Sequence, residues 1–122
     1  MKEVIGKKTW IFADGDLPPA GDKEPFGHES IMVLNLNEEK ADLEIDLYFD
    51  NMEPVLGLKE SIDAKRVKSI YMHKAVGEQQ YKVPFGQYAI VLRSNIPVVA
   101  VFGRLDVRQP NMAFYSVQGY SC

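Results

Sequence analysis

The sequence predicts an all-β protein: an antiparallel β-sandwich of about eight strands, jelly-roll-like, with no substantial helix. The strongest observation is alternation with a period of two, clearest over residues 41–49, where apolar residues alternate with Asp42, Glu44, Asp46 and Tyr48. Successive side chains of a strand point to opposite faces, so this segment has one buried face and one solvated face. Turn signals recur at the spacing typical of sandwiches, and no segment shows a long, well-capped helical period.

Two facing sheets are the natural way to bury this much apolar material, because a single sheet could not bury it all. A small closed barrel is the second-best fold. Most of the expected strands combine β-branched or aromatic residues with flanking turn formers. In chain order they cover residues 9–14, 29–35, 41–49, 56–62, 66–72, 87–94, 98–105 and 113–119.

The segments between these strands have the chemistry of turns and loops. Residues 35–40 are polar and contain two asparagines, which bond locally and tolerate a left-handed backbone. Residues 94–97 are expected to link two apolar strands tightly, with Pro97 at a strand start, where a missing N–H matters least. Residues 14–27 are rich in Gly and Pro and predict a long loop. A second loop is expected over residues 73–86, with one helical turn near its middle.

The bulk composition fits a single domain over residues 1–122. A net charge of −3 opposes a general attraction to nucleic acid or anionic membranes, although a local basic patch stays compatible with it. The first eight residues lack a hydrophobic signal core, and no apolar run approaches the roughly 20 residues that cross a bilayer. Cys122 is the only cysteine, which excludes an intrachain disulfide and a Cys-based metal cluster. We therefore expect a cytoplasmic protein without direct membrane insertion.

The most informative segment is residues 104–109, which follows an apolar run typical of a buried strand. In an extended chain Arg104, Asp106 and Arg108 share one face, and charges at the end of a buried strand need partners. Two interpretations remain open. Either Asp106 clamps both arginines in an internal ladder, or one guanidinium is left to hold an anion or a partner carboxylate. With Gln109, these residues are candidate binding residues.

His28 and Glu29 are further candidates, because a histidine beside an acid at a loop–strand junction has the chemistry of a base or a metal ligand. Adjacent strand residues point to opposite faces, however. This favours an interpretation in which His28 packs on the loop and Glu29 is solvated or paired with an arginine. His73 is the only other histidine. Both histidines could join a mixed His/carboxylate site if they converged in space, but their spacing matches no familiar metal motif. We expect no metal and no cofactor.

Aromatic residues offer material for an interface or a sugar platform, with core filling as the default role for most of them. Trp10 is the candidate we retain as a binding residue, because Tyr and Trp at strand ends are enriched in recognition. Nucleophile and nucleotide motifs are absent: the sequence has no GxSxG, no phosphate-binding GxxxxGK[ST] and no GxGxxG. For a chain of this length, that absence predicts a protein that is not an enzyme.

The chain resembles the small soluble transducer family associated with microbial sensory rhodopsins. The matching residues span nearly the whole chain in order, and the combination of SNIPVV with RLDxRQ is specific. They are Trp10–Gly15 with Pro18 and Pro19, His28–Ser30, Leu34 and Asn35, Glu53 and Pro54, Arg66, Ser94–Val99, Arg104–Asp106, Arg108 and Gln109.

This resemblance implies a β-sandwich that assembles as a homotetramer and passes on a signal from a membrane photoreceptor or another signalling protein. It implies protein recognition rather than catalysis. Two alternatives stay open. The fold is also similar to carbohydrate-binding modules, which suggests a small-molecule or sugar ligand. Transcription-related roles with DNA binding have been considered for the family, although the negative net charge makes nucleic acid a weaker partner.

Overall fold

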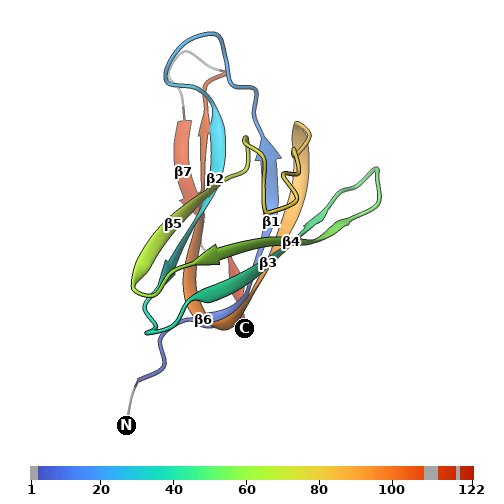
Figure 1. The fold of residues 1–122 in the computed structure, drawn as a ribbon. Helices are drawn as coiled ribbons and strands as arrows, with labels where there is room; N and C mark the ends of the chain where they lie inside the picture. Colours follow the sequence, from blue (N-terminus) through green and yellow to red (C-terminus); the bar gives the residue numbers. More distant parts are fainter. Residues whose placement is uncertain (1–2, 109–112, 118) are drawn as a thin grey trace.

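The computed structural model describes residues 3–108, 113–117 and 119–122, and these residues form an antiparallel β-sandwich without a helix (Figure 1). The predicted fold class is confirmed. The strands are β1 (Lys7–Leu17), β2 (His28–Asn35), β3 (Ala41–Tyr48), β4 (Val55–Ile62), β5 (Arg66–Tyr71), β6 (Gly86–Asp106), β7 (Ala113–Val117) and β8 (Tyr120–Ser121). Among the described residues there is accordingly no helix that could cross a bilayer.

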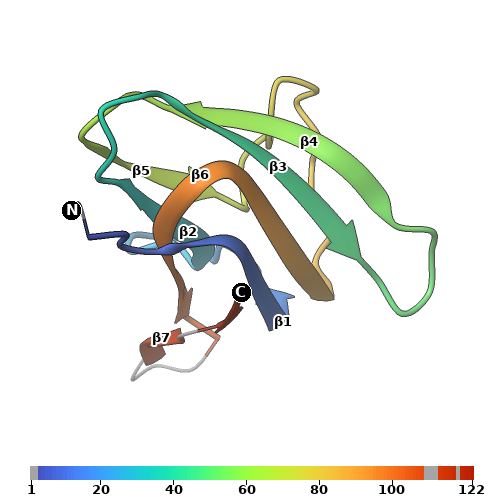
Figure 2. The ribbon, with the colours of Figure 1, turned by 90° about the horizontal axis from the view of Figure 1, so that it is seen from below.

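The two sheets share one strand. The first sheet has the order β4-β3-β6-β1-β8, and the second joins β5, β2, β6 and β7. Up to Val98, β6 pairs with β1 and β3; from Val99 onward it pairs with β2 and β7. Figure 2 looks onto the bend between these halves, where β6 forms an arch. The bend carries the chain from one layer of the sandwich to the other.

This continuous β6 corrects the prediction of two strands joined by a turn at residues 94–97. The segment does bend, but it stays extended and keeps its pairing on both sides: Ser94 lies opposite Leu43, and Val99 lies opposite Leu34. Pro97 lies where the strand changes partners, so its missing N–H removes little from either ladder. Eight strands are still present because the short β8, which we did not predict, replaces the one lost by this merger.

A second correction concerns the loop before β6. The expected helical turn near residues 78–80 is a tight turn over residues 77–80, closed by an isolated bridge between Val76 and Tyr81. Gln80 has a φ of +55°, a left-handed conformation that a helix does not contain. The turn is closed by two backbone hydrogen bonds between Val76 and Tyr81, at 2.8 and 2.9 Å.

The core lies between the two sheets and follows the predicted alternation except at Asp46, which was expected on the solvated face but is buried and paired with Arg93. On β3, Leu43, Ile45 and Leu47 are buried while Asp42 and Glu44 are exposed. Residues of this kind contribute roughly 1.5–3 kcal/mol each when fully buried. The rings of Phe12 and Phe102 stack across the core with centroids 5.8 Å apart.

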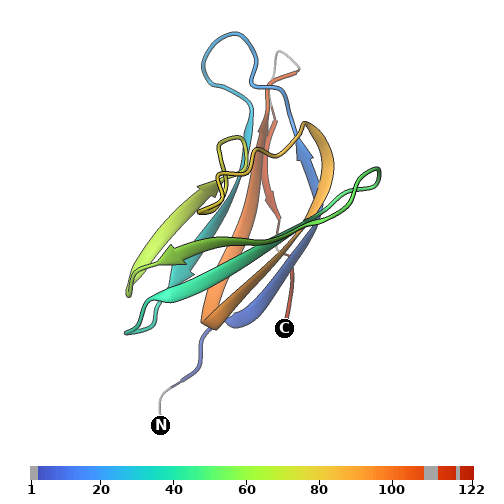
Figure 3. The same cartoon turned by 45° about the vertical axis from the view of Figure 1, so that its right-hand side comes forward.

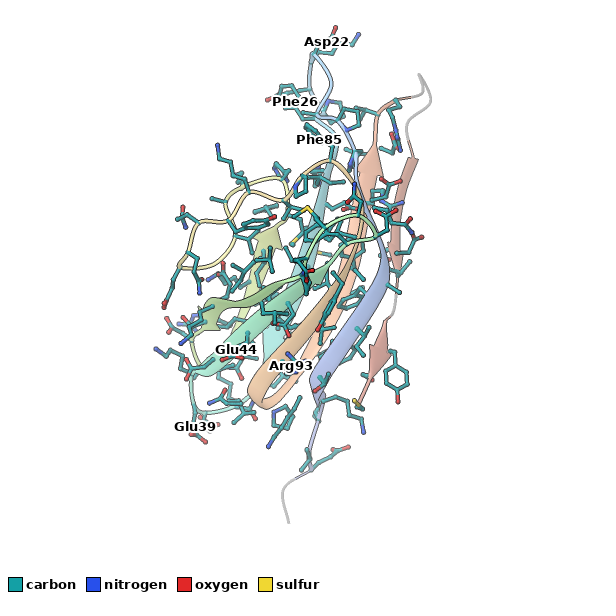
Figure 4. The ribbon with its side chains drawn as sticks, turned by 90° about the vertical axis from the view of Figure 1, so that its right-hand side faces the viewer. Asp22, Phe26, Glu39, Glu44, Phe85 and Arg93 are labelled. Carbon is teal, nitrogen blue, oxygen red and sulfur yellow. The ribbon has the colours of Figure 1, made fainter. Side chains whose placement is uncertain are left out.

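The sandwich has two ends, a bend end and a loop end. The bend end carries the β6 bend and the β2–β3 and β4–β5 turns, and the carboxy terminus lies toward it in Figure 3. The loop end carries the loop over residues 18–27. Figure 4 places Asp22, Phe26 and Phe85 at the loop end and Glu39 at the bend end.

Asn35 holds the bend end together. It is fully buried, and its Nδ2 donates to the carbonyls of Glu39, Ile62 and Asp63 at 2.8, 3.2 and 3.2 Å. Its Oδ1 accepts from the backbone and side chain of Asn37, whose Nδ2 donates to the Pro97 carbonyl at 2.7 Å. Asn35 thus joins the two turns, and Asn37 ties them to the bend of β6.

We expect Asn35→Ala to lower the free energy of unfolding by about 2–4 kcal/mol, because several buried backbone groups lose their partner at about 1–3 kcal/mol each. Urea denaturation measures this loss. Asn95→Ala is the matched control, since Asn95 makes one exposed bond, from the Asp42 N–H at 2.8 Å, and should cost less than about 1 kcal/mol. Equal losses in the two variants would contradict the central role of Asn35.

Candidate functional site

The candidate site is built on a buried ion pair between β2 and β6. Glu29 and Arg104 lie directly opposite each other in the ladder of these strands. The Arg104 Nε donates to the Glu29 Oε2 at 2.5 Å, and the two side chains are 8% and 0% exposed. A carboxylate that is fully removed from water needs such a partner, because an uncompensated buried charge costs several kcal/mol.

Three further hydrogen bonds complete this network. The Asp16 N–H donates to Glu29 Oε2 at 2.9 Å, and the Tyr88 hydroxyl donates to Oε1 at 2.7 Å. Arg104 also donates from Nη2 to the Asp14 carbonyl at 2.7 Å. The network therefore joins β1, β2 and both halves of β6. Burial, then the negative charge of Glu29, raise the pKa of Tyr88, so its hydroxyl stays a proton donor.

The predicted ladder in which Asp106 clamps both arginines is wrong. The hydrogen bonds of Asp106 run to Arg108: its Oδ1 accepts from the Arg108 backbone N–H at 2.9 Å, and both carboxylate oxygens accept from Nε at 3.0 Å. Arg104 pairs with Glu29 instead, because the β2–β6 register places that carboxylate directly opposite it. The two arginines differ in exposure: Arg108 is exposed, whereas Arg104 is buried.

The Asp106–Arg108 pair is partly exposed and follows the buried Arg104 in the sequence. Hydrogen bonds from Arg108 are the main cause that lowers the pKa of Asp106 to about 2. The Arg108 side chain is 53% exposed, so solvent weakens the pair and its guanidinium stays accessible from outside. Gln109, the next candidate, lies outside the described residues.

His28 and Glu29 diverge, as strand alternation predicts. Glu29 is buried in the network, whereas His28 is half-buried and its Nδ1 bonds to the Phe26 carbonyl at 2.9 Å. This agrees with the interpretation in which His28 packs on the loop and Glu29 pairs with an arginine. The ring of His28 lies beside that of His73, with centroids 5.4 Å apart.

Both histidines line an open hollow of about 700 Å³ at the loop end. The Tyr71 ring meets His73 edge-on with centroids 5.5 Å apart, and the Lys74 Nζ lies 5.0 Å from the Tyr71 ring centre. The other lining residues are Glu24, Pro25 and Phe26. Partial burial of the ring and the charge of His28 lower the pKa of His73, although the residue as a whole is exposed.

Trp10 is not placed for binding. Its side chain is 7% exposed and lies in the core, where Nε1 donates to the carbonyls of Lys7 and Val98 at 3.1 Å each. The prediction that it recognises a ligand is therefore not supported by its position. No group of three or more His, Cys, Asp or Glu side chains suited to a metal occurs within residues 3–108, 113–117 and 119–122.

Sequence reasoning missed the residues that complete the buried Glu29–Arg104 network and the loop-end hollow. Tyr88 carried a weak signal, since a hydroxyl in an apolar strand needs a buried partner. Asp14 and Asp16 contribute backbone groups, which no side-chain pattern reveals. Lys74 and Phe26 join the hollow because two loops converge, and the sequence gives no signal for that.

We expect Glu29→Gln to lower the free energy of unfolding by about 3–5 kcal/mol, because it leaves the buried guanidinium of Arg104 without its carboxylate. Denaturant unfolding measures the loss, and Asp106→Asn is the control at a partly exposed pair, where the loss should be much smaller. The double variant Glu29→Gln/Arg104→Gln should lose less than the sum of the single variants. Additive losses would show that the two residues are not coupled.

The lowered pKa of His73 predicts a pH dependence of folding. Because the unfolded histidine takes up its proton more readily, the stability associated with its neutral form is present above the unfolded pKa of about 6.5. That stability is lost as the pH falls through the lower pKa of the folded state. Thermal melts between pH 7.5 and 5 should therefore show a shallower decline for His73→Asn than for the unmodified chain. Parallel curves would remove His73 as a cause.

Comparison with known proteins agrees with this architecture. The solved structure described as "Crystal Structure of Thermotoga maritima 1070" superimposes with a TM-score of 0.83 at 26% identity, covering 96% of each chain. The structure described as "Anabaena sensory rhodopsin transducer" superimposes with a TM-score of 0.74 at 31% identity, covering 89% of this chain and 96% of that one. Among curated proteins, none matches the chain. The family model described as Anabaena sensory rhodopsin transducer matches residues 5–121, nearly the whole sequence, and the chain therefore belongs to that family.

Proposed function

We propose that this chain is a non-enzymatic signalling adaptor that acts by recognising another protein. The observation that carries the proposal is the exposed Asp106–Arg108 pair at the end of β6. Arg108 presents a planar donor group suited to a carboxylate on a partner, and Asp106 fixes its direction through three hydrogen-bond donors of the same residue.

The buried network below supports this role by holding the end of β6 in place. Arg104 is fixed to Glu29 and to the Asp14 carbonyl, so the strand that ends in Asp106 is anchored two residues earlier. A recognition group on a fixed support loses little conformational freedom when it binds. The arrangement suits binding of a preformed partner surface.

The proposed partners are a second copy of the chain and a membrane photoreceptor or other signalling protein in the cytoplasm. Family membership supports the photoreceptor or signalling partner, since a solved structure at 31% identity is described as a sensory rhodopsin transducer. In a homotetramer each copy would present its own Arg108. Several copies of one site raise the avidity for a clustered partner.

A second candidate function is binding of a small molecule, such as a sugar, in the loop-end hollow. Its volume of about 700 Å³ and its lining of an aromatic ring, two imidazoles and a lysine favour this alternative. DNA binding is less well supported, because the chain carries a net charge of −3.

Binding to a detergent-solubilised sensory rhodopsin, measured by biolayer interferometry, tests the adaptor function. We expect Arg108→Ala to weaken binding about tenfold or more, because a charge-assisted contact at a recognition site contributes about 1.5–3 kcal/mol. Arg66→Ala is the matched control, since Arg66 is an exposed arginine at the bend end. Equal binding by both variants would remove Arg108 from the interface.

Light scattering on the same samples measures assembly, with a mass of four chains expected for the unmodified protein and for both variants. A stable monomer would contradict the oligomeric adaptor. A large thermal shift with one member of a sugar panel, together with no binding to the receptor, would favour the small-molecule alternative.

A further inference from the structure

The two histidines of this chain are brought together by strand register. In the β2–β5 ladder Ser30 lies opposite Tyr71 and Ile31 lies opposite Ile70. Each step outward along β2 is matched by one step along β5, and the Met72 N–H donates to the Glu29 carbonyl at 2.8 Å just past the ladder. The next step places His28 beside His73. Their proximity follows from the sheet itself and not from a chance meeting of two loops.

The separation of the rings fits two imidazoles on one metal ion. An imidazole nitrogen about 2.0–2.1 Å from zinc puts its ring centre about 3.2 Å from the metal, so two rings at a tetrahedral angle have centres about 5.2 Å apart. The His28 and His73 centroids are 5.4 Å apart, and the ring planes are inclined by 52° rather than stacked. The pair has the spacing of metal ligands without a metal-specific sequence motif.

The hydrogen bond of the His28 ring leaves a nitrogen lone pair of the neutral imidazole for an ion. The Phe26 carbonyl can only accept, so the His28 Nδ1 carries the hydrogen of their 2.9 Å bond and the Nε2 keeps its lone pair. Metal-binding histidines characteristically donate their second ring N–H to a backbone carbonyl or carboxylate, which fixes the tautomer.

The charged side chains of the hollow are compatible with a bound cation. Lys74 is the nearby cation, but its Nζ lies over the Tyr71 ring at 5.0 Å from the centroid. Glu24 adds a carboxylate to the lining of the same hollow.

We propose that His28 and His73 together bind a divalent transition-metal ion of the zinc class, through one ring nitrogen each. Imidazole nitrogen is a preferred ligand for zinc, copper and nickel, and discriminates against calcium and magnesium. The described residues supply no group of three metal-binding side chains, so water in the open hollow completes the coordination. Such a site exchanges its ion readily and keeps positions open for a further donor. The proposal is independent of the adaptor function.

Titration calorimetry with zinc chloride tests the site. The starting protein carries Cys122→Ser, because Cys122 is an exposed thiol and would bind zinc on its own account. We expect one ion per chain, and about a tenfold or greater loss of affinity in both His28→Ala and His73→Ala, since each removes one of two protein ligands. Lys74→Ala, a change in the same hollow that removes no ligand, should retain the affinity.

A second measurement separates ligation from a structural effect. His28 is half-buried and His73 is exposed, so both alanine variants should keep the circular dichroism spectrum of the parent. In the parent, zinc should shift the ring nitrogen resonances of both histidines in NMR spectra, whereas magnesium should leave them in place. Absence of zinc binding, binding that survives either histidine substitution, or a shift confined to one ring would overturn the two-histidine site.

Discussion

The buried carboxylate of Glu29 is the constraint on which the sandwich depends toward its loop end. With no exposed surface, it has to be satisfied entirely by protein groups, and those groups come from Arg104, Tyr88 and the backbone of Asp16. These residues lie on β1, β2 and both halves of β6. One charge therefore fixes how the two sheets sit against each other where β1 and β2 approach the loop end. The Glu29–Arg104 contact also positions the exposed Asp106–Arg108 pair, which follows Arg104 in the sequence.

Asn35 plays the corresponding role at the bend end with a neutral amide. Its contacts join the two turns, and through Asn37 they reach the strand that crosses between the sheets. The two ends differ in a useful way. The Asn35 side chain is neutral and bonds mostly to backbone groups, whereas the buried carboxylate of Glu29 requires the buried guanidinium of Arg104. Arg104 in turn positions the end of β6, and the exposed Arg108 follows that end.

The period-two pattern was sufficient to predict the fold class, because residues 41–49 alternate almost without interruption. It was insufficient for β6, since Asn95 and Pro97 are turn formers whose usual meaning is overridden by pairing on both sides of the bend. Glu29 was predicted to be solvated or to pair with an arginine, but choosing Arg104 requires the β2–β6 register. The histidine pair needed the β2–β5 register in the same way. Both registers pair strands that lie far apart in the sequence, so a local pattern does not reveal which residues face each other.

A strand shared by two sheets has a consequence for how the chain is made. As residues leave the ribosome, β3 can pair with β4 and β2 with β5, because those partners are already present. The pairings of β1, by contrast, are with β6 and β8, which are synthesised much later. The amino-terminal strand, with Trp10 and Phe12, thus remains without its ladder until most of the chain has emerged. Completion of the sandwich is a late event in synthesis, and an exposed apolar strand during that interval is a natural target for chaperones that hold nascent chains.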